Sequence, residues 1–111
     1  MNDIRDAELY WSAKECTDKK HRNVLLNQLS SEFPDSDYIG YALEMKMSDE
    51  MRSKLSEMVL NRPYNNEQIL FVMWHGDKKN SEIAKKRHEE HWESRKHEFE
   101  NYLRPSLQHA V

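Results

Sequence analysis

The chain has 111 residues, of which 37% are hydrophobic and 33% are charged, and its net charge at neutral pH is −3. This length corresponds to a single domain over residues 1–111, and an apolar content below the roughly 45–50% of average globular proteins predicts a thin core. The acidic balance excludes a global attraction to nucleic acids or anionic membranes.

Helix breakers are scarce, because the sequence holds only two glycines and three prolines. We therefore predict an all-α fold, a compact bundle of four to six helices with a long, charged C-terminal helix. The single cysteine, Cys16, leaves no internal disulfide and is typical of a reducing compartment. The first residues lack the apolar segment of a secretory signal, and no apolar run approaches the roughly 20 residues of a membrane span. We expect a cytoplasmic protein without a membrane segment.

Residues 3–33 form the first predicted helical segment. Its apolar residues keep one helical phase throughout, which favours a single long helix. The polar interval over residues 14–23, where Thr17 can act as an N-cap, favours two helices instead. The sequence leaves both alternatives open, and Pro34 ends the segment because the residue before a proline avoids the α region.

Two shorter helices are predicted next. The Asp-Ser-Asp segment at residues 35–37 is typical of a helix start, and it precedes a short helix over residues 38–43. Ser48 and the two acidic residues after it predict the start of another helix. Its apolar residues follow at i, i+4, i+7 and i+8 over residues 51–59, which is an amphipathic pattern, and Pro63 lies beyond its end.

Residues 69–74 are six consecutive apolar residues, preceded by a capping pair, Asn65 and Gln68, and followed by Gly76. Their pattern alone fits either a strand or a buried helix. No second β-rich segment exists in the sequence to satisfy the backbone of a strand. We therefore predict the central buried helix here, with four largely buried residues, Ile69, Leu70, Val72 and Met73.

The C-terminal helix is predicted from Ser81 to Leu103, with Asn80 or Ser81 as its N-cap and Pro105 beyond its end. At about 100° per residue, one face collects its aromatic and histidine residues. This face holds Ala84, His88, His91, Trp92, Arg95, Phe99, Tyr102 and Leu103. Basic residues crowd the start of the helix and acidic residues its second half, opposite to the order that the helix macrodipole favours. We infer that contacts outside the helix recover the lost stability.

We predict that this face binds another protein chain. The expected interface residues are His88, His91, Trp92, Arg95, Phe99 and Leu103. In one arrangement two copies of the helix pair antiparallel and cross near Trp92. Lys85 and Lys86 of each copy then lie against the glutamates beside Phe99 of the other, so a homodimer accounts for the inverted charges. Packing of the same face on residues 4–33 of its own chain is the alternative.

The sequence contains no catalytic, cofactor or metal motif that we would assign. His88 and His91 share a helix face, but a zinc site needs at least one or two further ligands. The next positions along that face, Ala84 and Arg95, supply none. Two glycines cannot build a phosphate-cradling loop, and no base is identifiable that would activate Cys16. We therefore predict no metal, no cofactor and no enzymatic activity.

A basic cluster at the start of the C-terminal helix is the strongest indication of nucleic-acid binding. The cluster, a candidate contact for a polyanion, consists of Lys78, Lys79, Lys85, Lys86 and Arg87. A helix-turn-helix over residues 48–60 and 66–75 is disfavoured, because its reading helix would present apolar residues where polar side chains should meet base edges. The glutamates that follow the cluster also oppose this interpretation.

The function that we predict is that of a non-enzymatic protein-binding regulator, for example an inhibitor, an immunity protein or an adaptor that occupies a partner's surface. Small size, a thin core, a charge-striped helix and the lack of catalytic motifs favour it. A small nucleic-acid-associated factor that uses the basic cluster at residues 78–87 is the alternative. Polyanion binding that weakens steeply with salt would favour this alternative.

Overall fold

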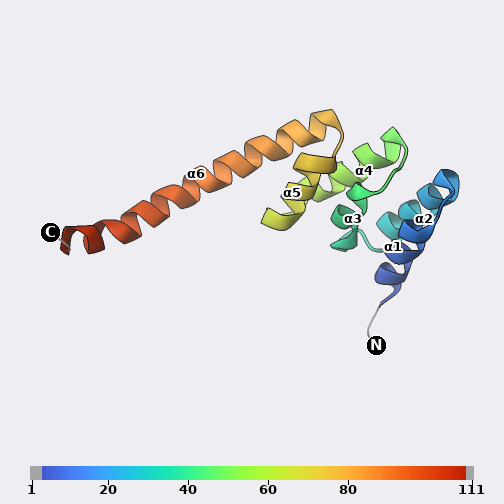
Figure 1. Ribbon diagram of the computed structural model, residues 1–111, viewed down its shortest axis with the longest axis horizontal. Coiled ribbons are helices and arrows are strands. Elements are labelled where there is room, and N and C mark those ends of the chain that lie inside the picture. The colour runs from blue at the N-terminus through green and yellow to red at the C-terminus, as the bar shows by residue number, and fades with distance from the viewer. Residues whose placement is uncertain (1–3, 110–111) are drawn as a thin grey trace.

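The computed structural model describes the backbone of residues 4–109 and the side chains of residues 4–96. This part of the chain folds into helices joined by short connecting segments. In chain order they are α1 (Arg5–Glu15), α2 (Lys19–Glu32), α3 (Tyr38–Tyr41), the 3₁₀ helix η1 (Ala42–Glu44), α4 (Asp49–Leu60), α5 (Asn66–His75) and α6 (Lys78–His109). No strand occurs in this range, so the predicted all-α bundle is confirmed. Figure 1 shows α1 and α2 at one end, α3–α5 in the middle, and α6 running past α5 and beyond the body.

The first segment forms two helices rather than one. The N-cap of α2 is Asp18, whose carboxylate accepts a hydrogen bond from the backbone N–H of Lys20 at 3.1 Å, whereas Thr17 was the predicted cap. The guanidinium of Arg22 reaches back across the break and donates to the carbonyl of Ala13 at 2.9 Å and to that of Cys16. Charge-assisted bonds of this kind hold the end of α1 against the start of α2.

Serine and asparagine side chains begin the middle helices as predicted. The Ser36 hydroxyl accepts from the backbone N–H of Tyr38 at 3.1 Å, and it donates to the Asp6 carboxylate at 2.8 Å, which joins α3 to α1. Ser48 caps α4, and Asn65 caps α5 by accepting from the backbone N–H of Gln68 at 3.0 Å. Each cap satisfies a backbone donor that the first turn of a helix leaves without a partner.

The core receives buried side chains from every helix, α1 to α6, and from η1. Its largest fully buried apolar side chains are Leu26, Leu29, Ile39, Leu43, Leu55 and Val72. Three methionines, Met45, Met47 and Met51, are also buried in this cluster and help to fill the core.

Helix α5 is only partly buried, which corrects the prediction of a central buried helix. Ile69 and Val72 are buried as predicted, whereas Leu70 and Met73 are half-buried and Trp74 is 69% exposed. The reason is geometric: successive helical residues point about 100° apart, and α3, α4 and α6 do not surround the helix. An apolar run in a helix is buried only on the sides where neighbours pack.

Helix α6 begins earlier and ends later than predicted. It begins at Lys78, and Asn80 is a buried residue of its first turn that donates to the Asp77 carboxylate at 2.8 Å. It continues through Pro105 to His109, so the prediction that it ends before Pro105 is wrong. Proline fixes φ near the helical value, so the backbone of a helix can pass through it, at the cost of one backbone hydrogen bond and of crowding between its ring and the carbonyl four residues earlier.

Candidate protein-binding surfaces

The turn between α5 and α6 sets the direction in which α6 leaves the body. A Cβ atom at Gly76 would lie 2.6 Å from the carbonyl oxygen of Val72 and 2.9 Å from the hydroxyl of Ser56. Glycine is therefore required for the close approach of this turn to α4. The Ser81 hydroxyl then donates to the carbonyl of Met73 at 2.6 Å, which holds the first turn of α6 against α5.

The first part of the predicted interface face is covered within the chain. Ala84 is fully buried, and the His91 ring stacks on the Tyr64 ring with centroids 4.1 Å apart. Nδ1 of His88 lies 3.3 Å from the Tyr64 hydroxyl. The predicted alternative, packing on residues 4–33, placed this face on the wrong element, because α6 packs chiefly on α5 and less extensively on α4.

The second part of that face lies further along α6, the helix that extends beyond the body in Figure 1. Trp92 is 52% exposed and contacts the rings of His88 and His91 edge to face, at 6.1 Å between centroids in both pairs. Arg95 is exposed. The predicted interface residues Phe99 and Leu103 lie outside the residues whose side chains are described. About half of a large aromatic side chain on α6 is therefore exposed to solvent.

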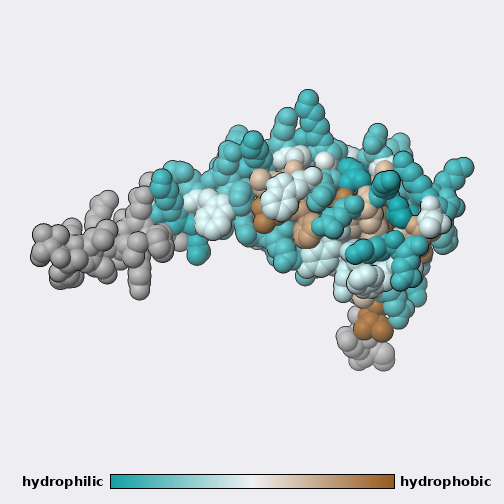
Figure 2. All heavy atoms as spheres, viewed as in Figure 1, coloured by the Kyte–Doolittle hydropathy of each residue, from teal (hydrophilic) through white to brown (hydrophobic). Residues whose placement is uncertain are grey.

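A second exposed aromatic surface lies on α5 and was missed in the sequence analysis. It is a hollow of about 240 Å³, which we call the Trp74 groove, lined by Glu44, Glu67, Leu70, Phe71 and Trp74. The sequence signal for this groove is Glu67, because Leu70, Phe71 and Trp74 follow it at i+3, i+4 and i+7 and so share its helix face. A glutamate on this face indicates that the face is exposed to solvent, whereas the apolar run over residues 69–74 was predicted to be a buried helix. Figure 2 shows apolar and weakly polar atoms gathered over the α3–α5 region.

Two carboxylates stand at the Trp74 groove. The Tyr41 hydroxyl donates to the carboxylate of Glu67 at 2.6 Å, and this hydrogen bond, with burial and the charge of Glu67, raises the pKa of Tyr41 to about 12. The Glu44 carboxylate lies 4.0 Å from Nε2 of His75. The Phe71 ring packs edge to face against Tyr41, with centroids 5.2 Å apart, and completes the aromatic wall.

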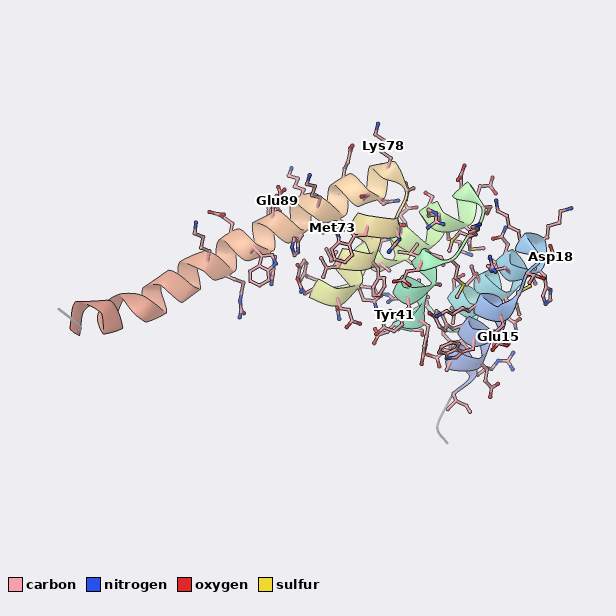
Figure 3. The ribbon with its side chains drawn as sticks, viewed as in Figure 1. Glu15, Asp18, Tyr41, Met73, Lys78 and Glu89 are labelled. Carbon is pink, nitrogen blue, oxygen red and sulfur yellow. The ribbon has the colours of Figure 1, made fainter. Side chains whose placement is uncertain are left out.

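The basic cluster lies on the start of α6. Lys78, Lys79, Lys85 and Lys86 are exposed, and Figure 3 shows the Lys78 side chain pointing away from the body. Arg87 differs, because its guanidinium donates to the carbonyl of Leu60 at the end of α4. All five predicted polyanion contacts are thus exposed, but the guanidinium of Arg87 also bonds within the chain.

Among the side chains of residues 4–96, no three His, Cys, Asp or Glu residues come close enough together to hold a metal ion. None of the helices within residues 4–109 has an apolar stretch of the length needed to cross a lipid bilayer. No family model, curated protein or solved structure matches this chain.

Proposed function

We propose that the chain is a non-enzymatic, cytoplasmic protein-binding regulator that acts by occupying the surface of a partner, as an inhibitor, an immunity protein or an adaptor does. The observation that carries this proposal is the exposure of Trp92 on α6, the helix that extends beyond the body in Figure 1. Tryptophan is enriched among the residues that dominate binding energy at protein interfaces. When a partner covers such a side chain, the burial of its aromatic surface adds stability that the thin core of the chain does not supply.

A second copy of the chain is one partner that fits this proposal. Lys85 and Lys86 are exposed, so they are available to glutamates of another α6 in an antiparallel pair. Because Ala84 is buried against the body, the contact would run along the outer side of α6 before Trp92 and along its uncovered face after it. Opposed helix dipoles also favour the antiparallel arrangement.

The test of this proposal compares two tryptophans of similar exposure. Trp92→Ala is expected to reduce self-association, or association with a captured partner, at least tenfold while the helical circular dichroism signal stays unchanged. The matched control is Trp11→Ala, whose side chain is 50% exposed on α1, a helix that lies far from α6 in Figure 1. Sedimentation velocity at micromolar concentrations measures self-association. Equal behaviour of the two variants, or global unfolding of Trp92→Ala, would contradict the proposal.

The second candidate function is a nucleic-acid-associated factor, favoured by the four exposed lysines at the start of α6. If it is correct, a short DNA duplex binds and the logarithm of the association constant falls linearly with the logarithm of the salt concentration. Lys85→Gln/Lys86→Gln then lowers the slope by about 0.9 for each phosphate that the variant no longer neutralises. Absence of binding at low salt rejects this candidate.

A further inference from the structure

The Trp74 groove is a second exposed surface, separate from that of Trp92 on α6. Its apolar lining comes from Leu70, Phe71 and Trp74 on α5, and Glu44 of η1 also lines it. Trp74 is the most exposed of the three tryptophans at 69%. The apolar lining of the Trp74 groove is therefore accessible to a partner.

The size of the groove restricts what it can hold. Sites for cofactors and drug-sized ligands have volumes of about 300–1,000 Å³, and the Trp74 groove, at about 240 Å³, is smaller. This volume suits one or two side chains of a peptide or protein rather than a whole small molecule.

The charge of the groove restricts its occupant further. Glu44 and Glu67 are both exposed and lie at its edge. Glu67 already accepts a hydrogen bond from Tyr41 through one oxygen. A carboxylate has about four lone-pair sites, so it retains acceptor capacity for an ammonium or guanidinium group. An acidic or phosphorylated segment would meet like charge here, whereas a basic one would be attracted.

We propose that the Trp74 groove receives an apolar side chain that stands next to a lysine or arginine in the partner protein. The apolar side chain packs on Leu70 and Trp74, and the basic neighbour pairs with Glu44 or Glu67. This inference rests on the proposed protein-binding function and names the chemistry of the partner segment.

Three capped peptides test the proposal: acetyl-Lys-Leu-Lys-amide, acetyl-Glu-Leu-Glu-amide and acetyl-Lys-Ser-Lys-amide. The readout is the amide and indole nuclear magnetic resonance spectrum of the full chain, in which each tryptophan contributes one indole N–H signal. We expect the first peptide to shift the Trp74 signal progressively and to leave those of Trp11 and Trp92 in place. The second and third peptides should bind at least fivefold more weakly, because each lacks one of the two required features.

Variants of the groove complete the test. Trp74→Ala should abolish binding of the Lys-Leu-Lys peptide, and Glu44→Gln/Glu67→Gln should remove its advantage over the Glu-Leu-Glu peptide. Trp92→Ala is the control that leaves the groove intact. Equal binding of all three peptides, equal shifts at all three tryptophans, or full binding by Trp74→Ala would overturn the inference. The effect of Trp92→Ala on association is measured separately, so failure of the groove and failure of the proposed function are distinguishable.

Discussion

Four arginine side chains hold the ends of helices through backbone carbonyls. Arg22 donates to the end of α1, Arg62 to the carbonyl of Pro34 after α2, and Arg87 to the end of α4. Arg52 bonds the carbonyls of Leu43 and His75 at 2.6 Å and that of Met45 at 2.8 Å. The last carbonyls of a helix lack partners within it, and their partial negative charge favours a cation. In a chain with few apolar residues, these contacts join helices that a small core holds only partly.

Arg52 is the sharpest place to test this role. Arg52→Met keeps much of the length and removes all donors, so it should lower the free energy of unfolding by about 1.5–3 kcal/mol. Arg52→Lys should restore only part of the loss, because one ammonium cannot reproduce a planar fork that bonds three carbonyls. Lys54→Met on the same helix is the control, since Lys54 is exposed and makes a single exposed hydrogen bond, to Oδ1 of Asn27 at 2.7 Å, so this variant should lose less stability than Arg52→Met. Urea unfolding measures all three, and equal losses for Arg52→Met and Lys54→Met would refute the role.

At the scale of the helices, local chemistry was predictable and contacts between helices were not. Ser48 and Asn65 begin their helices as predicted, because a cap depends on a few adjacent residues that the sequence displays together. Trp74 and Tyr64 were not predictable in this way. Whether Trp74 is buried depends on which sides of α5 its neighbours cover, and the contact of Tyr64 with His88 and His91 joins residues more than twenty positions apart.

The two sides of α5 should respond differently to truncation. Ile69→Ala removes a buried side chain and should cost about 2–5 kcal/mol, enough to unfold much of a marginal domain. Leu70→Ala, at a half-buried position of the Trp74 groove, should cost clearly less because water already reaches its side chain. Thermal unfolding followed by circular dichroism measures the difference. A larger loss for Leu70→Ala than for Ile69→Ala would contradict this description of α5.

At the scale of the whole molecule, the long axis is 63 Å and the shortest 21 Å, since α6 extends beyond the body. The reversed charge order along α6, noted in the sequence, belongs to a helix whose start packs on α5 and α4. Packing therefore compensates for part of the unfavourable dipole interaction. A partner bound along the rest of α6 would compensate for a larger part of this unfavourable interaction.

The proposed antiparallel pairing makes a prediction about charge exchange. Lys85→Glu/Lys86→Glu should weaken self-association by up to about fivefold per ion pair, and adding Glu98→Lys/Glu100→Lys should restore it. Lys78→Glu/Lys79→Glu makes the same change of charge at positions that would face no glutamate in this register, and should have a smaller effect. Sedimentation equilibrium measures the dissociation constants. Equal weakening by both lysine pairs, without rescue, would reject this register.

The contact of Tyr64 with His88 and His91 also bears on the position of the C-terminal end of α6 relative to the body. From His91 to His109 the helix has 18 residue steps, a length of about 27 Å at 1.5 Å per residue. A tilt of about 10° at this contact would move the tip of such a rod by about 5 Å. Small rearrangements of the Tyr64, His88 and His91 rings would therefore change where a partner bound to α6 is held relative to the body.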